Sequence, residues 1–232
     1  MKLGIMQPYF FPYIGYWQLM NYVDEYVVYD DVNFIKGGWI NRNRILLNGQ
    51  PYMINIKMQG ASPYKHINEI DIADDSVFVR KQLSTIEMAY KKAPYFDETF
   101  EIAQKIYSST SVKLSERLFE SIKAVCEYLD IDTKLILSSE LDKDDNLKGK
   151  DKVISICKEL GADTYINAIG GTSLYDKEEF KNNGIRLNFL KPGEIEYSQG
   201  KYPFVASLSI LDVMMFNSKE EIKDKLKHFE LV

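Results

Sequence analysis

The sequence has few of the residues on which many catalytic and metal sites depend. Its 232 residues include two cysteines and only two histidines, His66 and His228, which lie far apart. We therefore expect no Ser-His-Asp or Cys-His catalytic device, and no Cys/His cluster has the spacing of a zinc site. The chain also lacks a Gly-x-Gly-x-x-Gly motif and a P-loop. These absences argue against a nicotinamide enzyme and a Walker-type ATPase.

Positive charge and long apolar runs are also scarce. The net charge is −5, so no broad basic field is available for nucleic acid. No run approaches the 18 apolar residues typical of a membrane span. The stretch before Pro8 is too short for a secretory signal, and Cys126 and Cys157 lie in helical patterns, where we expect buried thiols rather than a disulfide. These features predict a cytoplasmic protein.

Strand and helix patterns alternate at both ends of the chain. Such alternation predicts an α/β protein with an open, mainly parallel sheet and covering helices, of the nucleotidyl-transferase or Rossmann-like type. We expect one domain over 1–232. The expected strands are Lys2–Gln7, Glu25–Tyr29, Thr133–Leu137, Asp163–Asn167 and Ile185–Leu190, and the expected covering helices are Gly15–Val23, Asp151–Leu160 and Asp176–Asn182.

Two further parts interrupt this alternation. A β-hairpin is expected where Arg44–Leu47 and Pro51–Lys57 flank Asn48-Gly49, a strong hairpin-turn sequence. The region of about 75–130 predicts a helical subdomain. Its expected helices are Val77–Lys92, Phe100–Tyr107 and Lys113–Leu129. Near the C-terminus, Ser209 and Asp212 predict a capping box. The segment Glu220–Phe229 predicts a charged amphipathic helix.

The first candidate site follows the first strand. The segment from Gln7 to Tyr16 holds two prolines and many aromatic residues, and in open α/β sheets ligands bind where strands end. The alternative is a rigid loop that caps the core. The register Tyr13-x-Gly15-Tyr16 overlays the His-x-Gly-His motif of nucleotidyl-transferring enzymes, with tyrosine at both histidine positions. The expected nucleotide contacts are Gln7, Tyr9, Tyr13, Gly15 and Tyr16.

The second candidate site follows the Gly37-Gly38 pair. Arginine offers a fork of donors for phosphate or carboxylate, and asparagine adds directional bonds. Arg42 and Lys57 are the expected anion ligands, and a solvated strand edge is the alternative. The expected substrate contacts here are Trp39, Asn41 and Asn43.

The third candidate site follows the second strand. Asp30 and Asp31 form a carboxylate pair beside Asn33, and we expect one to cap a turn and Asp31 to bind a substrate amine. Asn33 is an expected substrate contact. His66 lies in a loop and is a candidate catalytic residue.

Further polar residues follow the later strands. Gly170 and Gly171 resemble a backbone cradle for phosphate, although a tight turn fits equally well. Tyr175, Tyr197 and Gln199 are additional candidate ligand contacts.

Several long blocks resemble the WbqC-like family, and the resemblance covers nearly the whole chain. The blocks are QPYFFPYIGYWQLM (7–20), YDDVNFIKGGWINRNRI (29–45), GGTSLYDKEEFKNNGIRLNFL (170–190), YSQ (197–199) and SLSILDVMMFN (207–217). The resemblance implies a cytosolic bacterial protein linked to O-antigen, lipopolysaccharide or related surface-glycan synthesis. It does not define the reaction.

The resemblance and the sheet pattern together predict a ligase or transferase. Our first hypothesis is ATP-dependent N-acylation of a nucleotide-linked aminosugar with a small amino acid such as glycine, using ATP with Mg²⁺ and no resident metal. The alternatives are an ATP-independent acyl- or glycosyl-transferase and a non-catalytic sugar-nucleotide binding protein. The expected partners are these small molecules, and a homo-oligomer is compatible with the sequence.

Overall fold

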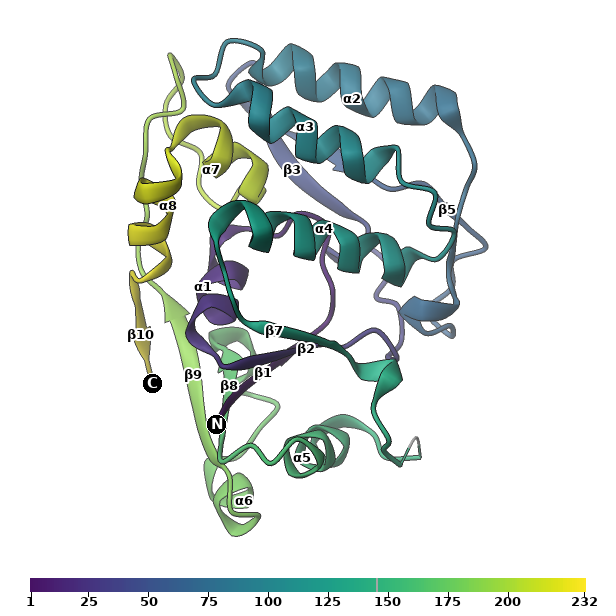
Figure 1. Cartoon of the computed structure of the whole chain (residues 1–232), viewed down its shortest axis with the longest axis vertical. Helices are drawn as coiled ribbons and strands as arrows, with labels where there is room; N and C mark the ends of the chain where they lie inside the picture. The colour runs from purple at the N-terminus through teal and green to yellow at the C-terminus, as the bar shows by residue number, and fades with distance from the viewer. Residues whose placement is uncertain (145) are drawn as a thin grey trace.

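The centre of the protein is a six-stranded sheet with the order β10-β9-β8-β1-β2-β7 (Figure 1). The computed structural model describes residues 1–144 and 146–232. Neighbouring strands pair in parallel except β10, which is antiparallel to β9. The structure is therefore an α/β fold with a mainly parallel sheet. The strands are β1 (Lys2–Met6), β2 (Glu25–Val28), β7 (Lys134–Leu137), β8 (Thr164–Ala168), β9 (Arg186–Pro192) and β10 (Phe229–Leu231).

The strand order reverses at the middle of the sheet. From β1 the chain proceeds outward through β2 to β7, and it then returns to the other side of β1 to form β8, β9 and β10. This is the 3-2-1-4-5-6 order of doubly wound sheets, in which ligands bind at the carboxyl ends of the strands beside the reversal. The position of interest is therefore the carboxyl end of β1 and β8.

Helices cover both faces of the sheet (Figure 1). One apolar cluster joins Leu3 and Ile5 of β1 to the inner faces of two helices, α5 and α6. A larger cluster lies on the opposite face and includes residues of α1, α4, α7 and α8. The covering helices are α1 (Ile14–Tyr22), α4 (Leu114–Leu129), α5 (Gly149–Glu159), α6 (Lys177–Asn182), α7 (Ile210–Phe216) and α8 (Lys219–Leu226).

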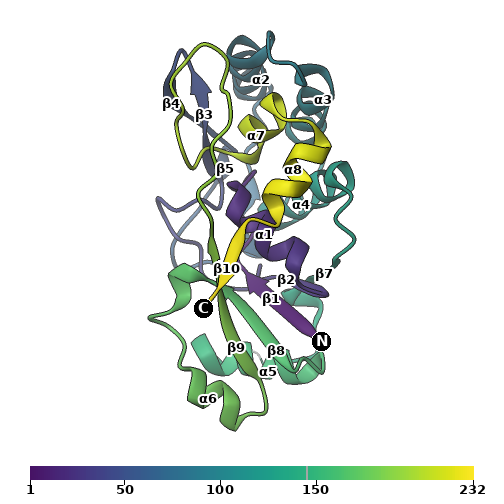
Figure 2. The same ribbon diagram turned by 90° about the vertical axis from the view of Figure 1, so that its left-hand side faces the viewer.

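The middle of the chain forms the expected hairpin and helices, which lie together at one end of the molecule (Figure 2). Asn48 and Gly49 have φ values of 52° and 76°, as a two-residue type I′ turn requires. These elements are β3 (Arg42–Leu47), β4 (Gln50–Asn55), the short pair β5 (Met58–Gln59) and β6 (Asp71–Ile72), α2 (Ser76–Tyr90) and α3 (Phe96–Tyr107), and the 3-10 turns are η1 (Ile67–Glu69), η2 (Ser138–Glu140) and η3 (Ile169–Gly171).

Two predicted helices differ from the observed ones by three residues or more at one end. Helix α3 begins at Phe96 rather than Phe100, and Asp97 and Glu98 in its first turn complement the positive end of the helix. The predicted helix Glu220–Phe229 ends at Leu226, because Phe229–Leu231 instead pairs with the edge of β9. Within the residues that the structure describes, no helix combines the length and apolar character needed to cross a bilayer.

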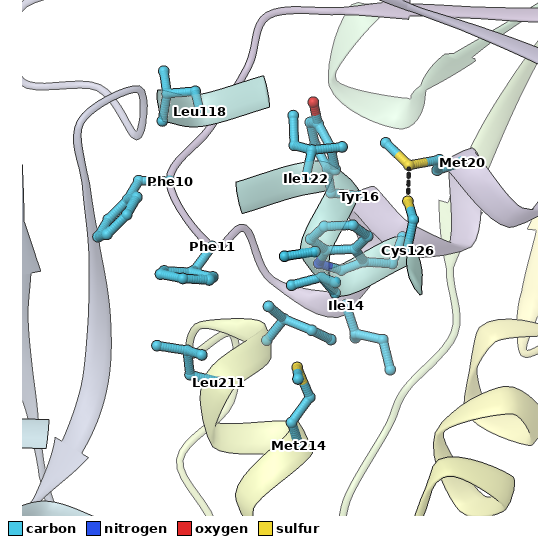
Figure 3. Close-up of a cluster of buried hydrophobic side chains, with 14 of the residues drawn as sticks. Phe10, Phe11, Ile14, Tyr16, Met20, Leu118, Ile122, Cys126, Leu211 and Met214 are labelled. Atoms are coloured by element: carbon cyan, nitrogen blue, oxygen red, sulfur yellow. Dashed lines mark hydrogen bonds between the residues drawn. The ribbon is translucent and has the colours of Figure 1, made fainter. Parts of the chain in front are cut away.

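The aromatic N-terminal segment supplies much of the core (Figure 3). Phe10 and Phe11 are fully buried, as is Trp17 of α1. Cys126 is also buried, with its Sγ 3.2 Å from Met20 Sδ. Burial raises the pKa of the Cys126 thiol to about 12, so the thiol stays protonated at neutral pH. Both cysteines are free, as predicted: Cys126 and Cys157.

Candidate functional site at the carboxyl edge of the sheet

Candidate residues follow three adjacent strands at one edge of the sheet. Gln7 follows β1, and Asp31 lies shortly after β2. The Tyr29 amide donates to the Met6 carbonyl at 2.9 Å, which holds these two strand ends side by side. Because the strands are parallel, Gly170 after β8 lies at the same edge as Gln7. Several predicted site residues are thus brought together.

A cluster of tyrosines surrounds the start of α1. The rings of Tyr9 and Tyr16 lie 5.8 Å apart, and the Tyr16 hydroxyl donates to the Gln7 carbonyl at 3.3 Å. The Tyr13 ring lies over Gly15, where any Cβ would overlap it. Burial raises the pKa of the Tyr13 hydroxyl, so it remains a neutral donor at physiological pH. The Tyr-x-Gly-Tyr motif therefore forms a compact unit at the carboxyl end of β1.

Two buried lysines converge on Asp31. Lys143 Nζ and Lys152 Nζ lie 2.8 and 2.9 Å from Asp31 Oδ2, and the three side chains are only 2%, 8% and 10% exposed. Lys152 also donates to the Asp31 backbone carbonyl and lies over the Tyr29 ring. This arrangement ties α5 and the segment before it to the end of β2.

The two neighbouring carboxylates have opposite pKa shifts. Burial alone would raise the pKa of Asp31, but the bonds from Lys143 and Lys152 outweigh it and lower the pKa. Burial raises the pKa of Asp30, despite hydrogen bonds from the Ser139 amide and hydroxyl at 3.0 and 2.7 Å. Asp30 thus caps the turn after β7, while the amines that Asp31 binds are lysines of the chain itself.

Asn33 and His66 meet at the same edge. They form an isolated antiparallel bridge, and the Asn68 amide donates to the Asp30 carbonyl at 3.1 Å. The His66 side chain is exposed. The loop before η1 therefore carries His66 to the end of β2.

Most side chains of the second predicted site bind backbone carbonyls. The Asn43 amide donates to the Phe10 and Phe11 carbonyls at 3.1 and 2.8 Å, and the Asn41 amide donates to Ile56. The Arg42 guanidinium donates to the carbonyls of two glycines in its own loop. These side chains fix loops rather than point toward open space.

Lys57 lies outside this cluster. Its ammonium group is 2.6 Å from Asp75 Oδ2, and Asp75 also accepts a bond from the Phe78 amide as the N-cap of α2. The expectation that Lys57 continues the hairpin strand is wrong, because β4 ends at Asn55. Lys57 therefore has a local partner at the start of α2.

Tyr197 and Gln199 surround Asp212. Both side chains donate to Asp212 Oδ2 at 2.7 Å, and Tyr90 donates to Oδ1 at 2.7 Å. The predicted capping box is wrong: Ser209 caps α7, as expected, but the fully buried Asp212 carboxylate points to these three donors instead. The network joins α2, α7 and the loop before α7.

The glycine loop after β8 closes over an asparagine. A Cβ at Gly171 would lie 3.0 Å from the Asn167 side chain, so glycine permits this close approach. The Asn167 amide donates to the Tyr165 hydroxyl at 2.8 Å, and the Tyr165 and Tyr175 rings lie 5.8 Å apart. Asn167 thus lies near the carboxyl end of β8, next to the point between β1 and β8 where the strand order reverses.

Four surface grooves lie away from this edge, such as one of about 500 Å³ between α5 and α6. None of these four is lined by Gln7, Tyr16 or Arg42. The Tyr13 ring lies against Gly15 in the first turn of α1, and Tyr13 as a residue is 38% exposed. A ligand at this turn would therefore meet the Tyr13 ring.

Comparison with known proteins identifies the family. The profile of the WbqC-like protein family matches residues 7–224. The chain belongs to this family. An uncharacterized protein of Mycobacterium tuberculosis, Rv1507c, is 28% identical over 232 residues, covering 98% of each chain. No solved structure matches the sequence.

All the candidate residues lie within the part that matches the WbqC-like family. Sequence reasoning nevertheless missed two charged residues of the edge, Lys143 and Lys152. One signal was available, because Lys152 falls on the stripe of α5 that buries Val153 and Ile156. A lysine on an apolar stripe predicts a buried partner.

Proposed function

We propose that the protein is an enzyme of surface-polysaccharide biosynthesis that binds a nucleotide-linked aminosugar at the carboxyl edge of its sheet. The proposed reaction is ATP-dependent N-acylation of the sugar amine with a small amino acid such as glycine. Family membership suggests the biosynthetic role. The observation that carries the location is the strand-order reversal between β1 and β8, with Gln7 on one side and Asn167 on the other.

The start of α1 suits the phosphates of a nucleotide. The helix has no acidic residue in its first turn and no side-chain cap, so an anion that displaces the Tyr13 ring would meet no competing side-chain acceptor there. The hydroxyls of Tyr9 and Tyr13 are neutral donors beside it. These features and the strand order support a nucleotidyl-transferase or Rossmann-like assignment.

His66 is the proposed base for the sugar amine. Asp31 is held by Lys143 and Lys152, so it does not provide a free carboxylate for an incoming amine. An exposed imidazole at the end of β2 can accept the proton that the amine loses as its nitrogen attacks the acyl carbon. ATP with Mg²⁺ would activate the carboxyl group of the amino acid by transfer of an adenylyl or phosphoryl group, and AMP or phosphate would leave as the amide bond forms.

Mass spectrometry tests this reaction. The protein is incubated with ATP, glycine and a dTDP-linked aminosugar, with omission of each component as a control. The proposal predicts a sugar nucleotide whose mass has increased by one glycyl group, formed only when all three substrates are present. Product formation without ATP would contradict it.

A second candidate is an ATP-independent transferase. The guanidinium of Arg42 and the ammonium of Lys57, which the sequence assigns to an anionic substrate, both have partners within the protein. This leaves fewer cations for a triphosphate. Acylation from a carrier thioester, in the absence of ATP, would support this candidate, and tight nucleotide binding without turnover would support a binding protein.

A further inference from the structure

Trp39 is presented on the surface by a tightly bonded loop. Trp39 is 40% exposed, whereas Trp17, the other tryptophan, is fully buried. The Arg42 Nε donates to the Gly38 carbonyl at 3.0 Å, and the Gly38 amide donates to Ile35 at 3.1 Å. Arg42 therefore closes the turn that carries the indole.

The same loop is joined to the end of β1. The Phe10 amide donates to the Trp39 carbonyl at 3.1 Å, and Asn43 holds the Phe10 and Phe11 carbonyls. Trp39 is thus continuous with the segment that leads from Gln7 to α1. Its position follows from the same backbone contacts that order the candidate site.

Arg44 stacks on Trp39. Its guanidinium carbon lies 5.3 Å from the centre of the indole, a distance at which cation–π attraction operates. The Arg44 Nε is buried without a hydrogen-bond partner, and Nη2 makes one long bond of 3.4 Å to the Ser207 carbonyl. Among the ion pairs of the described residues, none involves Arg42 or Arg44.

This combination has the properties of a nucleotide subsite. An exposed indole backed by a guanidinium offers a face on which a base can stack, and stacking of this kind tolerates any base. Two arginines without carboxylate partners leave a local positive charge that favours phosphates. An ordered loop also limits the entropy lost when a ligand binds.

We propose that Trp39 and Arg44 form the subsite that binds the nucleoside diphosphate portion of the sugar nucleotide, with the base stacked on Trp39. Arg42 is a positioning residue that orders the Trp39 loop. This inference rests on the proposed function, since it assigns the nucleotide portion of the same substrate.

Tryptophan fluorescence tests the subsite directly, because the chain has only two tryptophans and one is buried. Acrylamide quenching is measured with and without dTDP, and the affinity for dTDP, thymidine and pyrophosphate is measured by calorimetry. We expect dTDP to protect Trp39 from the quencher. Trp39→Ala should weaken dTDP binding about 5- to 150-fold, the range that corresponds to one stacked base.

Matched variants separate stacking from charge and from folding. Arg44→Gln should weaken the binding of dTDP and pyrophosphate more than the binding of thymidine. Trp39→Phe retains a smaller stacking face, so it should bind dTDP with intermediate affinity. Tyr52→Ala removes an aromatic residue of similar exposure, 41%, on β4 and should leave binding unchanged. Thermal melting confirms that each variant is folded.

Different results would contradict the Trp39 subsite and the proposed function. If dTDP binds the wild-type protein but leaves Trp39 accessible to acrylamide, and Trp39→Ala and Trp39→Phe bind it normally, the subsite is wrong while the proposed function stands. If neither dTDP, UDP nor ATP binds the wild-type protein at millimolar concentration, the proposed function fails and the subsite fails with it.

Discussion

Lys152 Nζ lies 2.9 Å from Asp31 Oδ2, although the two residues are 121 positions apart in the sequence. Both side chains are at least nine-tenths buried, and Lys143 Nζ shares the same carboxylate oxygen. A buried charge that loses its partner is strongly destabilising. The cluster therefore links the end of β2 to α5 and holds the carboxyl edge of the sheet together.

Asp31→Asn should lower the free energy of unfolding by about 3–5 kcal/mol, because it leaves the buried ammonium group of Lys152 without its carboxylate. Urea denaturation measures the change. Asp71→Asn is the matched control, since it breaks an exposed pair with Lys113 whose side chains are 43% and 44% exposed. That loss should be much smaller, because solvent screens an exposed pair. Equal losses in the two variants would contradict the structural role of Asp31.

The stabilisation from Asp31 should disappear in acid. Its pKa is lowered in the folded protein by Lys143 and Lys152 against the opposing effect of burial, so the folded state binds fewer protons than the unfolded state. The advantage of wild type over Asp31→Asn is thus complete above the unfolded-state pKa of about 3.9 and falls as pH drops through the folded-state pKa. Denaturation at a series of pH values tests this, and an advantage that grows in acid would be inconsistent with it.

Asp212 should show the opposite pH dependence. Burial raises its pKa, in spite of donors such as Tyr90, so the folded state binds more protons than the unfolded state. The free energy of unfolding of wild type, relative to Asp212→Asn, should therefore fall as pH rises above about 4 and level off beyond the folded-state pKa. A relative stability that rises over this interval would show that Asp212 is ionised more easily in the folded protein.

Asn43→Ala should destabilise the protein by about 1–3 kcal/mol, because two buried carbonyls each lose a donor, and only that of Phe11 keeps another, the Ser209 hydroxyl. One of them belongs to Phe11, whose φ of 42° is unusual for a non-glycine residue. Asn41→Ala removes a single bond to Ile56 from a partly exposed side chain and serves as the control. Thermal unfolding measures both. A change at Asn43 no larger than at Asn41 would argue against its role in ordering the N-terminal segment.

Arg42→Ala should weaken dTDP binding while leaving the melting temperature nearly unchanged. Its two bonds order only the turn that carries Trp39, and part of the side chain is exposed. Acrylamide quenching of Trp39 should also become faster as the turn loosens. A variant that unfolds, or one that binds dTDP as tightly as wild type, would remove Arg42 from the account.

Local signals in the sequence predict much of the fold. The apolar strand Lys2–Gln7 and the Asn48-Gly49 turn depend on near neighbours, and both are found within one residue of their expected positions. The predicted helix Glu220–Phe229 overlaps the C-terminal strand Phe229–Leu231 at Phe229, and no strand was predicted there, because pairing with β9 depends on a long-range contact that residue spacing does not encode. Local sequence patterns therefore identify helices and strands better than they identify which strands pair with one another.

The candidate site shows the same division. The carboxyl ends of β1 and β8 could be placed at one edge because parallel pairing requires it. The partners of Asn43 and Gln199 could not be predicted, since an amide that binds a ligand and one that binds a backbone carbonyl have the same sequence signal. Lys152 was missed because its carboxylate lies on a distant segment.

A crystal structure of the protein with dTDP would locate the nucleotide. We expect it at the carboxyl edge of the sheet, with its base on Trp39, its phosphates toward α1 and the Tyr13 ring displaced from Gly15. A nucleotide bound instead in the groove lined by Lys177 and Arg186, at the opposite end of β9, would contradict it.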